Sequence, residues 1–194
     1  MTEMKINIYL IRHGKTKENE EKRYVGITDT PLSDTGREKI AKNKESGIYP
    51  ADPDIIFASP MKRCMETAEI IYPGREIVYV DDFKEINFGL FEGKNYQELN
   101  GDKRYQEWID SNGKAPFPEG ESLEGFSERI MKGFEFLKDY CRDFYTNSQD
   151  SDERIVAVVA HGGTVMAIKS SVEGGEYFDH MIDNGMFSRV EICI

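Results

Sequence analysis

Two of the three histidines in this chain stand at the ends of apolar runs and are followed by glycine. His13 follows the run 6–11 within an Arg-His-Gly segment, and His161 follows the run 155–160 and begins a His-Gly-Gly segment. A neutral imidazole can act as a nucleophile or carry a proton near neutral pH, and glycine lets the backbone approach a bound group closely. The pattern therefore predicts a reactive site where two strands end. His180 lacks this setting and is interpreted as a packing or surface residue.

Two arginines are placed to join these histidines. Arg12 directly precedes His13, and Arg63 comes shortly after the apolar run 54–58 and a Ser-Pro pair. A planar guanidinium donates paired N–H groups that match the oxygens of a phosphate group. Beside a histidine nucleophile, such arginines predict phosphoryl transfer, because they neutralise the phosphate while the imidazole attacks phosphorus.

The elements that must carry these residues alternate between strand and helix. Apolar runs predict strands at 5–12, 54–58, 77–80 and 155–160, and a closing edge strand at 187–194. Amphipathic or capped segments predict helices at 33–46, at 60–71 with Pro60 in the first turn, at 122–145, and after Thr164. A polar linker is expected at 147–153.

This alternation predicts an α/β fold with three layers, α/β/α, around a mostly parallel central sheet. We expect residues 1–194 to form one domain, since this length is enough for one well-covered core. Residues 94–121 are aromatic and dotted with Gly and Pro, and they are interpreted as a small helical insertion over the active site. Ligands bind beyond the carboxyl ends of the strands in such sheets, so His13, Arg63 and His161 should meet there.

Polar residues and glycines recur along the chain in an order that can be compared with a known family. After the Arg-His-Gly segment come Thr16, Asn19, Arg23 and Gly26, then Thr30-Pro31-Leu32-Ser33 and Gly36, Ser59-Pro60-x-x-Arg63, Thr67-Ala68, Glu85-x-x-Phe88-Gly89-x-x-Glu92-Gly93, and His161-Gly162-Gly163. In this order the chain resembles the histidine phosphatase superfamily, in its phosphoglycerate mutase-like branch, over nearly its whole length. One departure is Lys15, where that family often has Glu or Gln, and we expect it to alter the charge beside the pocket without removing a catalytic group.

The resemblance implies a phosphohistidine mechanism. His13 is then the nucleophile, Arg12 and Arg63 bind the phosphate oxygens, and His161 stabilises the oxygens during transfer. Further phosphate- or substrate-binding groups implied by the family pattern are Asn19, Thr16, Arg23 and the backbone of Gly162. No metal and no cofactor is implied, because arginines and a histidine supply the positive charge that Mg²⁺ supplies in kinases.

The resemblance also assigns Glu85 as the acid that protonates the leaving oxygen and as the base that then activates water. The carboxylates of Asp81, Asp82 and Glu92 crowd the same stretch. Only the register of Glu85 with the two Gly-containing pairs that follow it selects Glu85 as the acid.

Three functions fit these residues. We expect a metal-independent phosphomonoester hydrolase acting on a small-molecule phosphate ester. A cofactor-dependent phosphoglycerate mutase is the alternative, although mutases of this kind are usually longer and differ in sequence after the acidic residue. The second alternative is a non-catalytic phosphate-binding protein on the same fold.

The substrate is suggested by three segments. Residues 85–89, 105–108 and 118–122 look like α-ribazole phosphatase, an enzyme of cobalamin biosynthesis, although broad-specificity acid-type phosphatases share much of this pattern. The candidate substrate is therefore α-ribazole 5′-phosphate. The aromatic residues of the insertion would either stack on a flat base or form the insertion's own small core, and they are Tyr96, Tyr105, Trp108 and Phe117.

Composition limits the partners. The chain has 25 Lys and Arg against 36 Asp and Glu, a formal net charge of −11, which disfavours nucleic acid and anionic membranes as partners. No apolar run approaches the ~20 residues that span a bilayer, and the N-terminal segment is too short and too charged for a secretory signal. Three cysteines without CxxC or zinc-type spacing indicate a reduced, cytoplasmic protein. The oligomeric state is not predicted.

Overall fold

A computed structural model describes residues 4–146 and 154–194, and its centre is a five-stranded sheet. The strands are β1 (Lys5–Arg12), β2 (Ile55–Ala58), β3 (Val78–Tyr79), β4 (Ile155–Ala160) and β5 (Phe187–Cys193). Their order across the sheet is β3-β2-β4-β1-β5. Every neighbouring pair is parallel except β1 with β5, which is antiparallel at the edge. The predicted sheet and its closing edge strand are confirmed.

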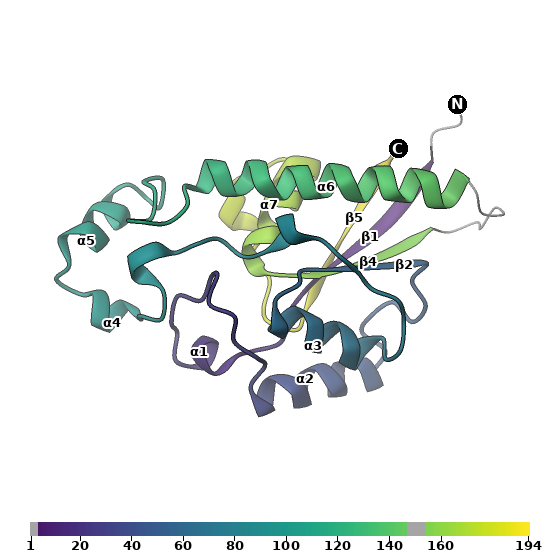
Figure 1. The fold of residues 1–194 in the computed structure, drawn as a ribbon, viewed down its shortest axis with the longest axis horizontal. Helices are drawn as coiled ribbons and strands as arrows, with labels where there is room; N and C mark the ends of the chain where they lie inside the picture. The colour runs from purple at the N-terminus through teal and green to yellow at the C-terminus, as the bar shows by residue number, and fades with distance from the viewer. Residues whose placement is uncertain (1–3, 147–153) are drawn as a thin grey trace.

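Helices cover both faces of the sheet (Figure 1). One face packs against α2 (Asp34–Glu45) and α3 (Lys62–Ile71), and the other against α6 (Leu123–Thr146) and α7 (Gly162–Glu173). Alternate residues of β4 belong to the two cores, with Val158 facing the α6 side and Val159 the α3 side. A strand buried on both faces reads as a continuous apolar run, which is why 155–160 was recognisable in the sequence. The three-layer α/β/α prediction is confirmed.

Smaller helices lie outside these layers. They are α1 (Lys17–Glu20), α4 (Tyr96–Leu99) and α5 (Lys103–Asp110), with 3-10 turns at Asp81–Phe83, Gly89–Phe91 and Tyr177–His180. Figure 1 shows α4 and α5 set apart from the sheet, beyond the N-terminal end of α6. They form the helical part of the predicted insertion.

Four details differ from the sequence predictions. Helix α3 begins at Lys62 with Met61 as its cap, so Pro60 precedes the helix and does not lie in its first turn, because the N–H of Ser59 still pairs with Val159 in the sheet. Helix α7 begins at Gly162, immediately after His161. The third strand is shorter than predicted, and α1 was not predicted. The predicted linker 147–153 lies outside the described residues.

Two further findings concern membrane-spanning segments and cysteines. Within 4–146 and 154–194, no helix is long and apolar enough to cross a membrane. All three cysteines are free: Cys64 and Cys141 are buried, and Cys193 is exposed.

Candidate active site

The parallel strands bring the predicted reactive residues together at one edge of the sheet. In the pairing of β1 with β4, Arg12 is opposite Ala160, so His13 and His161 both lie one residue beyond the sheet. Their rings are 5.2 Å apart between centroids and meet edge to face. Arg63, from the first turn of α3, completes the group. His13 is 4% exposed, and His161 and Arg63 are fully buried.

The backbone around His13 fixes which of its nitrogens can react. Nδ1 lies 2.6 Å from the carbonyl oxygen of Gly14. A carbonyl only accepts hydrogen bonds, so Nδ1 carries the ring proton and Nε2 keeps its lone pair. Burial, aided by the positive charge of Arg63, holds the pKa of His13 well below its ordinary value. His13 is therefore a neutral imidazole with its Nε2 free to attack.

Hydrogen bonds also fix the tautomer of His161. The Nε–H of Arg63 donates to Nδ1 of His161 at 3.3 Å, so the ring proton lies on Nε2, which is 2.9 Å from the hydroxyl oxygen of Ser59. Burial, with Arg63 and His13 nearby, lowers the pKa of His161 well below its ordinary value. His161 thus lies beside His13 as an uncharged N–H donor. Its contact with the oxygens of a bound phosphate stays a prediction.

The guanidinium of Arg63 is held by backbone carbonyl groups. Its terminal nitrogens donate to the carbonyl oxygens of Thr28, at 2.9 Å, and Gly26, at 2.7 Å. That loop is in turn held by Glu92, whose carboxylate accepts from the N–H groups of Gly26 and Ile27 and from the hydroxyl of Thr28. Because Glu92 is occupied with this loop, it is not free to act as the acid, although the sequence alone left it open.

Arg12 is held by a different part of the chain. One terminal nitrogen donates to the carbonyl of Ile182 at 2.6 Å, and a Cβ added to Gly162 would lie 3.2 Å from the guanidinium carbon. The Nε of Arg12 is buried without a hydrogen-bond partner in the described part of the chain. Buried donors are almost always paired, so this N–H is suited to a phosphate oxygen.

Glu85 reaches the same group from the segment after β3. Its carboxyl group accepts from the N–H of Ile86 at 3.0 Å and from the N–H of Gly163 at 3.3 Å. Glycine is required at position 163, since a Cβ there would collide with the Glu85 carboxylate. Burial raises the pKa of Glu85, although these N–H groups and the two arginines oppose the shift. A buried carboxyl group with a raised pKa beside a nucleophile has the properties of a general acid.

The other acidic residues of this stretch point elsewhere. The carboxylate of Asp82 lies 3.7 Å from the ammonium group of Lys132 on α6, and that of Asp81 pairs with Lys84 at 3.1 Å. Both pairs are at the surface.

Two predicted substrate-binding residues are used to build the fold. Thr16 is buried and caps α1, where its hydroxyl accepts from the N–H of Asn19. Arg23 forms ion pairs with Glu21 and with Glu98, 2.6 Å from each, and Glu98 belongs to the insertion. Arg23 does not join the histidine cluster. Binding of substrate or phosphate by these two residues stays a prediction.

Asn19 and Gly162 lie nearer the cluster. The side-chain oxygen of Asn19 accepts from Asn184, which also donates to the carbonyl of His13 at 3.2 Å. Gly162 opens α7 directly after His161, where the first N–H groups of a helix have no partner within it. Phosphate binding by Asn19 and Gly162 stays a prediction. Lys15, which follows the His13-Gly14 pair in the sequence, is exposed and lies near Glu20.

Arg129, Tyr177 and Asn184 support the cluster but were not found from the sequence. Arg129 on α6 donates to the carbonyls of Asp82, Lys84 and Glu85. The hydroxyl of Tyr177 donates to the carbonyl of Gly163 at 3.2 Å. Each acts through a contact between distant parts of the chain, and no local motif marks it.

A cavity of about 260 Å³ adjoins the cluster. Its lining includes Arg12, Glu85 and the two glycines of α7, together with the aromatic residues Tyr24, Phe88, Trp108 and Phe117. These aromatic rings also pack on one another, with centroids 4.9 Å apart for Phe88 and Phe117 and 5.1 Å for Trp108 and Phe117. Trp108 and Phe117 therefore form part of a small core and also line the cavity, and their stacking on a flat base stays a prediction.

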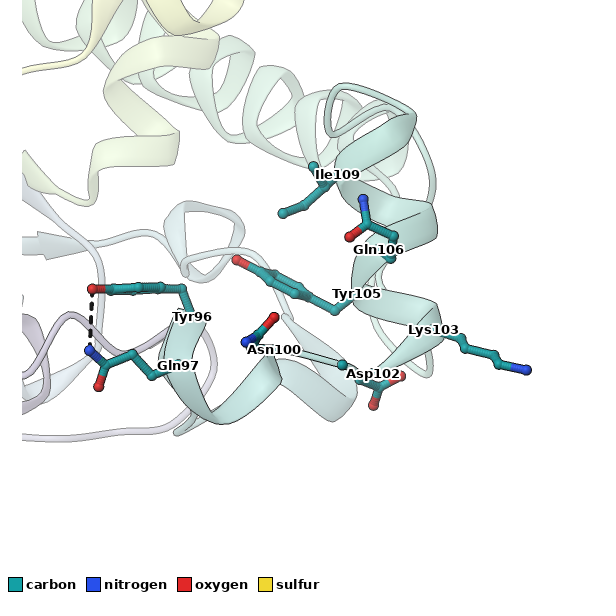
Figure 2. A pocket seen from close by; sticks show the side chains of 9 residues that line it. Tyr96, Gln97, Asn100, Asp102, Lys103, Tyr105, Gln106 and Ile109 are labelled. Carbon is teal, nitrogen blue, oxygen red and sulfur yellow. Dashed lines mark hydrogen bonds between the residues drawn. The ribbon is translucent and has the colours of Figure 1, made fainter.

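A larger hollow of about 700 Å³ lies on the insertion itself and holds none of the cluster residues. Figure 2 shows Tyr96, Asn100 and Tyr105 around it, with Lys103 extending outward. The smaller cavity, in contrast, is lined by Arg12 and Glu85. Among the described residues, no group of three His, Cys, Asp or Glu side chains is arranged to hold a metal ion.

Known proteins resemble this chain over nearly its full length. The sequence model of the histidine phosphatase superfamily (branch 1) matches residues 8–193. The uncharacterized phosphatase PhoE of Bacillus subtilis (strain 168) is 36% identical over 173 residues, which are 87% of this chain and 78% of that protein. The probable phosphoglycerate mutase GpmB of Escherichia coli O1:K1 / APEC is 29% identical over 177 residues, which are 87% of this chain and 75% of that protein.

The fold is likewise found among solved structures. The α-ribazole phosphatase of Shigella flexneri superposes with a TM-score of 0.80 and 23% identity, over 95% of this chain and 89% of that one. At this identity the likeness concerns the fold.

Proposed function

The chain belongs to the histidine phosphatase superfamily (branch 1), and from this premise we propose that it hydrolyses phosphate monoesters through a phosphohistidine formed on Nε2 of His13. The observation that carries the proposal is the hydrogen bond from Nδ1 of His13 to the carbonyl of Gly14, which leaves Nε2 as the unprotonated nitrogen. The pairing keeps the imidazole neutral and oriented, as a nucleophile must be. We further propose that residues 1–194 act as one domain.

In the first step, Nε2 of His13 attacks phosphorus and the bond from phosphorus to the ester oxygen breaks. The electron pair of that bond stays on the leaving oxygen, and Glu85 donates its proton there, which releases the alcohol. Arg12 and Arg63 neutralise the phosphate oxygens throughout, so a neutral nucleophile can approach a dianion.

In the second step, the Glu85 carboxylate takes a proton from water, and the water oxygen attacks the phosphohistidine. The bond from phosphorus to Nε2 breaks, its electron pair returns to His13, and inorganic phosphate leaves. The enzyme is then in its starting state. We propose that no metal ion takes part, since the two arginines provide the positive charge that the transferring group needs.

For the substrate, we propose a small-molecule phosphate ester, with α-ribazole 5′-phosphate as the first candidate. Support comes from the sequence likeness of the segments at 85–89, 105–108 and 118–122, and from the aromatic wall of the cavity. The relatives' names cover both phosphatase and mutase, so the test must measure the acceptor of the phosphoryl group.

The experiment is to expose the protein to a ³²P-labelled phosphate ester and quench in alkali, which preserves phosphohistidine. We expect acid-labile, alkali-stable labelling of the wild type and release of inorganic phosphate. His13→Ala should lose both, while His180→Ala, which changes the half-buried histidine outside the cluster, should keep both. Labelling that survives in His13→Ala would place the covalent chemistry elsewhere, and transfer of the label to 3-phosphoglycerate instead of water would favour a mutase.

A further inference from the structure

We propose that the cavity beside Glu85 is a binding site for an uncharged, apolar leaving group, so that the enzyme selects phosphate esters of aromatic alcohols and rejects esters carrying a second anionic group. The inference rests on the proposed phosphatase function and adds to it the class of alcohol that leaves.

The position of the cavity assigns it to the leaving group. Arg12 and Glu85 line the cavity, whereas His13, which is 4% exposed, and Arg63, which is fully buried, do not. A phosphoryl group held between the arginines and His13 therefore directs its ester oxygen past Glu85, the residue that protonates it. The alcohol then extends outward into the cavity.

The lining of the cavity is mostly apolar. It includes the four aromatic rings described above, together with Met166, Tyr177, Phe178 and Met181. Phe178 and Met181 are about half exposed, at 51% and 60%, and lie at the outer lip. The volume of about 260 Å³ exceeds the cavity of ~150 Å³ that is enough to bind benzene in another protein.

Trp108 adds a polar feature that also points to a ligand. Its indole Nε1 is buried and has no hydrogen-bond partner among the described residues. Buried indole N–H groups are normally paired. An aromatic alcohol with one uncharged acceptor atom, such as an ether oxygen or a ring nitrogen, would supply the missing partner.

A second anionic group finds no counter-charge in this cavity. Its lining residues, all within the described chain, include two charged groups, Arg12 and Glu85. Arg12 is committed to the phosphate, and the Glu85 carboxyl group repels an anion whenever it is ionised. The nearby guanidinium of Arg129 is neutralised by Glu121, 2.8 Å away. Burying a carboxylate without a partner is strongly unfavourable, so phosphoglycerate should bind poorly.

The experiment compares kcat/KM for benzyl phosphate, glycerol 3-phosphate and 3-phosphoglycerate. All three are alkyl esters, so their leaving alcohols need the same proton from Glu85 and differ mainly in what occupies the cavity. We expect kcat/KM to be at least about tenfold higher for benzyl phosphate than for glycerol 3-phosphate, and lowest for 3-phosphoglycerate. Equal values, or a preference for 3-phosphoglycerate, would overturn the inference.

Variants of residues that line the cavity test whether the preference for benzyl phosphate arises there. Trp108→Ala should lower kcat/KM for benzyl phosphate about tenfold, mainly through KM, and leave glycerol 3-phosphate nearly unchanged. Ile109→Ala, at the adjacent exposed residue that lines the other hollow, is the matched control and should change neither. An equal loss for both esters in Trp108→Ala would contradict a leaving-group site at this residue.

A charge placed at the lip gives a test that does not depend on the packing of Trp108. Met181→Arg should raise kcat/KM for 3-phosphoglycerate, because the carboxylate gains a partner, and Met65→Arg on α3 should not. No gain in Met181→Arg would count against the charge argument. Failure of the proposed function looks different, since the wild type would then hydrolyse none of the three esters and form no phosphohistidine.

Discussion

The guanidinium of Arg129 donates two hydrogen bonds to the carboxylate of Glu121, of 2.9 and 2.8 Å. The same guanidinium donates to backbone carbonyls on the N-terminal side of Glu85, and Glu121 accepts from the N–H of Asn87 on the other side at 2.8 Å. The ion pair of Arg129 with Glu121, which connects α6 to the end of the insertion, thus holds the backbone on both sides of Glu85. These contacts limit the freedom of the Glu85 backbone, and the Glu85 carboxyl group accepts from the N–H groups of Ile86 and Gly163.

Arg129→Lys should reduce the turnover of alkyl phosphates by about 10–100-fold, because an ammonium group cannot hold the carboxylate and three carbonyls in one plane and the acid is displaced. We also expect a loss of about 1–3 kcal/mol in the free energy of unfolding. The checks are kcat for benzyl phosphate, its pH profile, and urea denaturation.

The control for this change is Arg37→Lys. Arg37 pairs with Glu66 at 2.7 Å on the surface, where the contribution of an ion pair is small, so activity and stability should barely change. If Arg129→Lys lowers stability while the pH profile and kcat stay as in the wild type, Arg129 has only a structural role.

Glu92→Gln tests the support of the phosphate-binding arginine. An amide in place of the carboxylate directs an NH₂ group at N–H donors, so the loop that holds Arg63 should loosen, and stability should fall by about 1–3 kcal/mol. Activity should fall equally for alkyl and aryl phosphates, because the acid itself is intact. Steady-state kcat/KM for both ester types, alongside thermal unfolding, measures this. A selective loss for alkyl esters would make Glu92 the acid and refute the assignment of Glu85.

Glu85→Gln should slow the reaction of alkyl phosphates much more than that of aryl phosphates. A poor alkyl leaving group needs a proton and an aryl group such as p-nitrophenol does not, so the pre-steady-state burst should slow strongly for benzyl phosphate and little for p-nitrophenyl phosphate. The burst is the proper measurement, since the second step also uses Glu85, as a base. Equal slowing of both bursts would show that Glu85 does not protonate the leaving group.

The pH dependence follows from the directions of two pKa shifts. Burial raises the pKa of Glu85, so its acid form persists above the ordinary pKa of a glutamic acid, and phosphorylation of His13 by alkyl esters should decline as pH rises through the raised value. Burial lowers the pKa of His13, so the nucleophile stays neutral and the rate should hold until the pH falls well below 6.5. Burst rates measured across pH test both expectations. If the rate already falls near 6.5 as the pH is lowered, His13 is not shielded as the structure indicates.

Excess EDTA should leave activity unchanged, and vanadate, which mimics a five-coordinate phosphoryl centre, should inhibit competitively. The expectation follows from the use of arginine side chains as the positive charges around the phosphate. Steady-state assays with p-nitrophenyl phosphate provide the measurement. Activity that is lost in EDTA and restored by Mg²⁺ or Mn²⁺ would require a metal-dependent mechanism instead.

Local sequence was enough to predict most strands and long helices and the meeting point of the main reactive residues. Burial on both faces of a strand leaves an apolar run, so 5–12 and 155–160 were visible as strands, and the carboxyl ends of parallel strands lie at one edge. His13 and His161 had to meet because each directly follows such a strand. Arg63 could be placed near them for the same reason, although the start of its helix was misplaced by two residues.

What only the tertiary structure decided are relations between distant residues. The sequence favoured Glu85 over Glu92 only through its register with the Gly-containing pairs that follow it, because both are acidic residues in one stretch. The contacts differ: Glu85 accepts from Gly163, and Glu92 accepts from the 26–28 loop. The same holds for Arg23, whose partner Glu98 lies in the insertion. Periodicity of burial is a property of neighbours along the chain, whereas the direction and partner of a polar side chain depend on which segments fold against it.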